Sequence, residues 1–248
     1  MMTRHGVYAF LLWLGLTAVG LWWAFTANLF PMAAAEEAHI IDSAFRLLLI
    51  LGMPITTLVL AVLFYSVIRF RARGEATEDG PPIRTNRLIT WGWLAVTSAL
   101  AIYVIINPGL TGLAELSANP TESLVVQIEG QQWHWKVTYP QYNISYDQAL
   151  QMALPVNTRV KFEITSTDVI HSFWIPAFRM KMDAVPGKTT VMYVTPTETG
   201  AFEDDSNLRA QCAELCGTGH PNMSMNVLVL EPAQFEQWLT EAQMLTSN

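Results

Sequence analysis

The sequence predicts a membrane-anchored all-β protein, in which apolar helices near the N-terminus precede an antiparallel β-sandwich or barrel. Three observations support this fold class. Of the 248 residues, 51% are hydrophobic and 14% are charged, whereas an ordinary soluble domain carries about 25% charged residues. The apolar excess lies before residue 110, and from Leu124 onward apolar and polar residues alternate. We therefore expect a transmembrane region at 1–108 and an exported domain at 109–248.

Three apolar segments are each long enough to cross a bilayer: residues 7–26, 47–68 and 89–106. A helix rises about 1.5 Å per residue, so about 20 residues span a hydrocarbon core of about 30 Å. Pro54 lies inside the second segment. We expect it to kink that helix rather than end it, because an open backbone finds no water in lipid.

The distribution of arginine residues sets the orientation of these segments. The loop between the second and third segments carries five arginines, at positions 69, 71, 73, 84 and 87, whereas residues 27–46 contain only Arg46 among three acidic residues. The positive-inside rule places the arginine-rich loop in the cytoplasm and everything after Pro108 outside. The first segment also resembles a cleaved signal peptide, because it lies between Arg4 and the small residues at 33–35. We expect it to be retained as a helix.

The exported domain shows the period-two alternation of half-buried strands. Val160, Phe162 and Ile164 alternate with charged residues, and similar alternation occurs at 189–195 and 225–230. Proline and glycine separate these runs, which predicts about seven strands in two packed layers. Residues 232–242 read as a short amphipathic helix. From Gly109 onward, 15 acidic residues oppose 7 basic ones, a net charge of −8, which argues against nucleic acid and for a cationic partner.

One loop holds four residues of the kinds that bind soft metals: Cys212, Cys216, His220 and Met223. Glycine and proline within residues 217–221 make a helix there unlikely. Two thiols, an imidazole and a thioether suit copper better than magnesium or calcium, and His171 supplies a second imidazole. A disulfide, half of a zinc site or a thiol redox pair are the alternatives, but none of them needs Met223 or His171. A mononuclear blue-copper site uses one cysteine, so the second cysteine allows two bridged copper ions.

With these residues, the chain resembles subunit 2 of cytochrome c oxidase, a haem–copper oxidase, from about residue 40 to the end. The resemblance implies a cupredoxin domain with a dinuclear copper A centre. By that resemblance Cys212 and Cys216 bridge the two copper ions, and His171 and His220 each bind one. Met223 completes one copper and the carbonyl of Glu214 the other. The side chain of Glu214 would bind magnesium or manganese at the boundary with subunit 1.

The segment Gln132-Trp133-His134-Trp135 resembles the family's aromatic patch, with His134 in place of the usual tyrosine. The resemblance implies that electrons enter at Trp133. Trp135 fits that role or, equally well, the apolar face of a strand. The chain departs from the family pattern in three other ways. It has no acid at 85–93, it has an apparent insertion at 203–207, and its first apolar segment is additional to the usual two helices.

The resemblance implies an electron-entry subunit of a respiratory oxidase in a prokaryotic plasma membrane. It would take electrons from cytochrome c or another cationic donor and pass them to the haem of subunit 1. There oxygen would be reduced to water, coupled to proton pumping. Its partners would be subunit 1, other oxidase subunits, the donor and membrane lipid. The copper A subunit of a nitric oxide reductase is the alternative.

Overall fold

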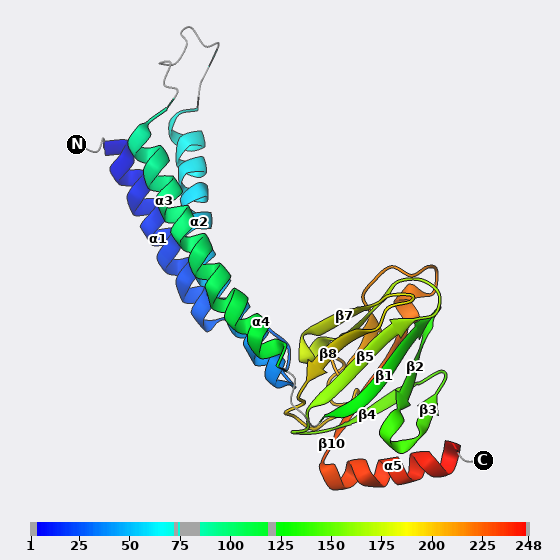
Figure 1. Cartoon of the computed structure of the whole chain (residues 1–248). Coiled ribbons are helices and arrows are strands. Elements are labelled where there is room, and N and C mark those ends of the chain that lie inside the picture. Colours follow the sequence, from blue (N-terminus) through cyan, green and yellow to red (C-terminus); the bar gives the residue numbers. More distant parts are fainter. Residues whose placement is uncertain (1–3, 72–73, 75–84, 119–122, 247–248) are drawn as a thin grey trace. The chain divides into compact units, whose positions relative to one another are not determined.

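A computed structural model describes residues 4–71, 74, 85–118 and 123–246 (Figure 1). The predicted cytoplasmic positions Arg73 and Arg84 lie outside the described residues. The chain forms two compact units. The first contains Met1–Leu29 and Ser43–Thr111, and the second contains Phe30–Asp42 and Gly112–Asn248.

The first unit is helical. Among the described residues, three helical stretches are long and apolar enough to cross a membrane. They contain α1 (Arg4–Thr26), α2 (Glu36–Arg69) and α3 (Arg87–Val104), and the third continues through a π-helical turn (Ile105–Leu110) into α4 (Thr111–Leu116). Pro54 lies within α2 without ending it, as predicted. Helix α2 begins well before its apolar run because Glu36 and Glu37 lie in its first turn, where acidic side chains favour a helix.

Helices α1 and α2 contact each other through polar groups at several levels. The Trp13 indole N–H donates to the carbonyl of Pro54 at 2.8 Å, and the hydroxyls of Thr17 and Thr57 lie 2.7 Å apart. Near the end of α1, the Arg46 guanidinium donates to the carbonyl of Ala24 at 2.7 Å. Such interhelical hydrogen bonds satisfy groups that lipid cannot, so α1 has a defined partner face on α2.

The second unit is a sandwich of two five-stranded sheets (Figure 1). The first sheet has the order β3-β2-β1-β5-β8, with β1 at Leu124–Gln131, β2 at His134–Tyr139, β3 at Ile144–Tyr146, β5 at Val160–Ser166 and β8 at Thr190–Val194. The second has the order β4-β10-β9-β6-β7, with β4 at Gln151–Pro155, β6 at His171–Ile175, β7 at Met180–Ala184, β9 at Arg209–Cys212 and β10 at Ser224–Leu230.

The predicted sandwich is confirmed, but residues 123–246 contain ten strands rather than about seven. Strands of three to five residues, such as β3 and β9, are too short for alternation to reveal them. The strand pairing is also mixed, because β1–β5 and β4–β10 are parallel. The chain leaves the first sheet after β3 and forms β4 in the second sheet. It then returns to place β5 beside β1, and this crossover lets the two strands run in the same direction.

The core lies between the two sheets. Its largest fully buried side chains include Trp135, Tyr139, Phe162 and Phe173. The predicted C-terminal helix is α5 (Pro232–Thr246), whose Trp238 ring lies 5.4 Å from that of Tyr139. Helix α5 therefore packs at the C-terminal end of β2, where Tyr139 lies.

Residues 30–42 form part of this unit although they precede α3 in the chain. The Ala34 amide donates to the carbonyl of Ala177, and the carbonyl of Ala34 accepts from Thr197, both at 2.9 Å. Two ion pairs strengthen the attachment, Glu37–Arg159 and Asp42–Arg179. The β-sandwich therefore depends on residues from the N-terminal third of the chain.

Candidate metal centre

The predicted metal loop starts where β9 ends at Cys212 and runs to Met223; we call residues 212–223 the copper loop. As predicted, it is not an α-helix, and a 3₁₀ turn occupies only His220–Asn222. Gly217 has a φ of +116°, which favours glycine because it has no Cβ. The loop is closed at its base, since the Cys212 amide donates to the carbonyl of Met223 at 2.9 Å.

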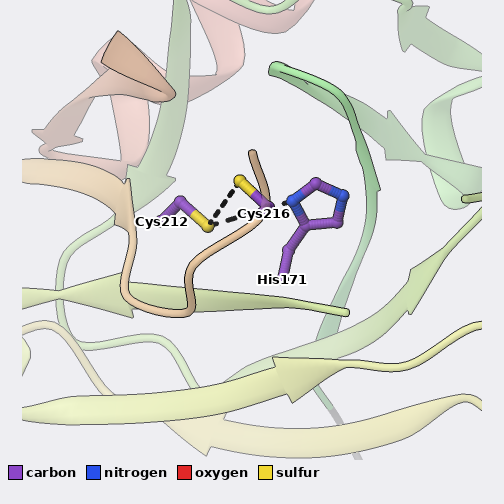
Figure 2. Close-up of side chains that lie close together, drawn as sticks. All are labelled: His171, Cys212 and Cys216. Atoms are coloured by element: carbon purple, nitrogen blue, oxygen red, sulfur yellow. Dashed lines mark hydrogen bonds between the residues drawn. The ribbon is translucent and has the colours of Figure 1, made fainter. Parts of the chain in front are cut away.

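The loop and β6 bring the predicted donor atoms together. The Sγ atoms of Cys212 and Cys216 lie 3.7 Å apart, and His171 Nδ1 lies 3.9 Å from Cys212 Sγ (Figure 2). His220 Nδ1 lies 3.7 Å from Cys216 Sγ, and Met223 Sδ lies 3.9 Å from the same sulfur. Each thiol therefore has one imidazole nitrogen beside it, in a nearly symmetric arrangement.

Glu214 contributes to this cluster through its backbone. Its carbonyl accepts a hydrogen bond from the Cys212 thiol at 3.2 Å, while the residue as a whole is exposed. The backbone oxygen and the side chain of this one residue therefore lie in different surroundings.

The donor set fits a soft metal ion. His171, Cys212, Cys216 and Met223 are all at least 93% buried, and both cysteines are free thiols. Burial, with a further contribution from Cys212, raises the pKa of the Cys216 thiol to about 12. A metal must therefore displace thiol protons in order to bind. Sulfur and imidazole donors suit copper, whereas magnesium and calcium prefer oxygen.

Asp168 orients one of the histidines. Its Oδ1 lies 2.8 Å from His171 Nε2, so the opposite ring nitrogen, Nδ1, is the one directed at the thiol. Burial opposes the charge on Asp168, but hydrogen bonds from His171 and from the amides of Gln132 and Val169 outweigh it and lower the pKa to about 2. Asp168 was not among the residues predicted from the sequence. An acid three residues before a candidate ligand histidine is the signal that would have indicated it.

The two predicted tryptophans lie in different environments. Trp133 precedes β2 and is 40% exposed, and its indole N–H donates to the carbonyl of Cys216 at 3.1 Å. Trp135 is 1% exposed and packs edge-on against Phe173 and His171, with ring centroids 5.4 and 6.0 Å away. Trp135 is thus a core residue that touches a predicted ligand, whereas Trp133 joins the surface to the copper loop.

Comparisons with known proteins show which family this chain resembles. Residues 146–230 match the family model described as cytochrome c oxidase subunit II, periplasmic domain. The cytochrome c oxidase subunit 2 of Thermostichus vulcanus is 27% identical over an alignment of 283 residues, which covers 93% of this chain and 84% of the relative. The alternative cytochrome c oxidase subunit 2 of Bradyrhizobium diazoefficiens is 29% identical over 214 residues, covering 75% of this chain and 74% of the relative.

A solved structure is also similar. The periplasmic domain of subunit II of cytochrome oxidase from Bradyrhizobium japonicum has 30% identity and a TM-score of 0.46, covering 50% of this chain and 96% of that one. The family model, the relatives that align along most of the chain, and the apolar helices describe a membrane-anchored protein with an outer β-domain. The chain belongs to the cytochrome c oxidase subunit 2 family.

Proposed function

We propose that this chain is the electron-entry subunit of its oxidase, with a dinuclear copper A centre in the copper loop. It takes electrons from cytochrome c or another cationic donor. It passes them to the haem of subunit 1, where oxygen is reduced to water with proton pumping. The observation that carries this proposal is the paired arrangement of two thiols 3.7 Å apart with one imidazole nitrogen beside each.

The residues assigned to the centre are Cys212 and Cys216 as bridges, His171 and His220 as terminal ligands, and Met223 and the Glu214 carbonyl as the remaining donors. Copper held by these residues would supply a one-electron relay with little rearrangement on reduction. The protein contributes rigidity. His171 lies on β6 and Cys212 on the adjacent strand β9, so sheet hydrogen bonds hold these two ligands, while Asp168 fixes the imidazole of His171.

Electrons enter at Trp133 in this proposal. Its ring is exposed, and its N–H contacts the backbone of Cys216 directly. The net charge of −8 from Gly109 onward attracts a positively charged donor and speeds its encounter with this domain. Trp135 is a second aromatic residue beside the proposed copper ligands, because its ring packs against that of His171.

The membrane part completes the proposal. The three helical stretches cross the plasma membrane of a prokaryote and leave the copper domain outside, as the arginine distribution indicates. Subunit 1 and the other oxidase subunits are its partners. The carboxylate of Glu214, exposed on the loop, binds a magnesium or manganese ion at the boundary with subunit 1, since such ions prefer oxygen ligands.

Metal analysis and electron paramagnetic resonance of the purified full-length chain test the copper assignment. We expect about two coppers per chain and a mixed-valence signal. Cys216→Ser should abolish that signal, because a hydroxyl oxygen is a poor bridge for a soft metal. One copper with a blue-site spectrum would contradict the proposal. Turnover of the purified complex with oxygen and with nitric oxide separates the oxidase from a nitric oxide reductase.

A further inference from the structure

Gln132 and Trp133 contact both segments that carry the predicted copper ligands. The Gln132 amide N–H donates to Asp168 Oδ2 at 2.7 Å, and Asp168 in turn binds His171. The Gln132 side chain donates from Nε2 to the carbonyl of Cys216 at 2.8 Å. The Trp133 indole N–H donates to the same carbonyl. This dipeptide therefore links the His171 segment to the copper loop.

Gly219 leaves room for the Trp133 ring. A Cβ built at position 219 would lie 2.3 Å from Cδ2, 2.5 Å from Cγ and 2.7 Å from Cε3 of Trp133. These atoms belong to the rigid part of the indole, so a small rotation at the end of the side chain cannot relieve the overlap. Any side chain at 219 would move the whole ring away from the loop.

The backbone at Gly219 does not itself require glycine. Its φ is −89°, which every residue adopts readily. Gly217 differs, because its φ is +116° and a Cβ there would lie 3.1 Å from Gln132 Nε2 and 3.2 Å from Trp133 Cζ2. At position 219, therefore, the structure indicates a requirement for space beside an aromatic ring and not for a turn.

We propose that Gly219 and Gln132 are positioning residues for electron entry. Gly219 lets the indole of Trp133 lie directly on the copper loop. The side-chain amide of Gln132 holds the Cys216 carbonyl at the position where the indole N–H of Trp133 reaches it. This inference rests on the proposed role of Trp133 as the entry point. Electron transfer weakens steeply with separation between donor and acceptor. A ring held by a 3.1 Å hydrogen bond to a ligand residue couples better than one displaced by a methyl group.

The experiment measures the rate of electron transfer from reduced cytochrome c to copper in the intact oxidase complex, by rapid mixing. The variants are Gly219→Ala, Gln132→Leu and Trp133→Phe. Gly112→Ala is the matched control, because a Cβ at 112 meets only Ile40 Cγ2 at an ordinary 3.9 Å. Copper content, the visible spectrum and the reduction potential are recorded for each variant.

We expect Trp133→Phe and Gly219→Ala to slow transfer by about 10- to 100-fold, as for an ångström-scale misplacement of a reacting group, with a smaller loss for Gln132→Leu. Copper content, spectrum and potential should stay unchanged in these variants, and Gly112→Ala should transfer at the wild-type rate. A merely structural role would alter the copper spectrum or content together with the rate.

The outcomes separate this inference from the proposed function. If Trp133→Phe transfers electrons at the wild-type rate, the entry point itself is wrong. If Trp133→Phe is slow while Gly219→Ala and Gln132→Leu are both fast with full copper, only the positioning inference is overturned. If Gly219→Ala loses copper, the positioning inference is tested with Gln132→Leu instead. In Gln132→Leu, slow electron transfer with copper retained supports the positioning inference, and transfer at the wild-type rate overturns it.

Discussion

The ion pair between Glu37 and Arg159 makes a strong prediction about stability. The Glu37 side chain is 2% exposed and that of Arg159 is 14% exposed. The other carboxylate oxygen of Glu37 accepts from the Thr195 amide at 2.9 Å. Arg159 also donates to the Thr195 hydroxyl at 3.1 Å and to the carbonyl of Ala118 at 3.0 Å. Glu37 is thus the only acid paired with Arg159 among the described residues.

Glu37→Ala removes the charge that compensates a buried guanidinium. Breaking a buried pair by deleting one partner costs about 3–5 kcal/mol. Arg159 keeps two hydrogen bonds and some solvent contact, which favours the lower end, while the orphaned Thr195 amide adds about 1 kcal/mol. We expect a loss of about 3–4 kcal/mol in the free energy of unfolding of the β-domain. At about 2–4 °C per kcal/mol, the melting temperature should fall by about 6–16 °C.

Thermal unfolding of the full chain in detergent, followed by near-ultraviolet circular dichroism, measures this shift. Glu37→Gln keeps an acceptor for Thr195 and should give an intermediate loss. Glu36→Ala is the matched control, because this neighbouring acid is exposed and should change stability by less than about 0.5 kcal/mol. If Glu37→Ala has the same melting temperature as Glu36→Ala, the ion pair does not stabilise the β-domain and this reasoning is refuted.

Titration of Tyr139, metal binding by Glu214, donor docking and retention of α1 can each be tested. Burial is the largest cause raising the pKa of Tyr139, so the contribution of this residue to stability should be constant below about pH 10 and fall above it, and Tyr139→Phe should reduce the alkaline fall by up to about 1.4 kcal/mol per pH unit in unfolding curves. Glu214→Gln should leave the copper spectrum intact but lower manganese occupancy; unchanged manganese would remove its side chain from the second site. Turnover with a basic cytochrome c should fall as ionic strength rises above about 0.1 M, whereas a flat response would indicate a donor held permanently in the complex. Because α1 contacts α2 through Trp13 and Thr17, the intact mass of the purified chain should include residues 4–26, and a chain beginning after Ala35 would contradict this.

The sequence predicts local features of this protein well. Regular alternation indicates β5 and β10, whose alternate residues are buried, because one face of each strand packs on the core. The soft donors of the copper loop are close in sequence and chemically distinctive, so their association needs no knowledge of the fold.

Features that depend on distant residues are not predictable in this way. Glu37 and Arg159 are separated by 122 positions, and nothing in either local pattern indicates that a helix start packs beside a strand start. The same holds for the bond between Asp168 and the Gln132 amide, which joins two loops. The predicted boundary at 108/109 likewise rests on composition, whereas residues 30–42 belong to the β-domain by contact.

His171 shows how the fold supplies what sequence spacing cannot. In the pairing of β6 with β9, Phe173 lies opposite Cys212, and opposite residues of paired strands project to the same face. His171 is two residues before Phe173, so it shares that face, and its ring nitrogen comes to 3.9 Å from the Cys212 sulfur. A slip of one residue in this register would place Ser172 there instead, and a hydroxyl is a poor ligand for copper. The register of β6 on β9, set by the packing of Phe173 in the core, therefore decides whether the four side-chain donors of the copper loop acquire a fifth.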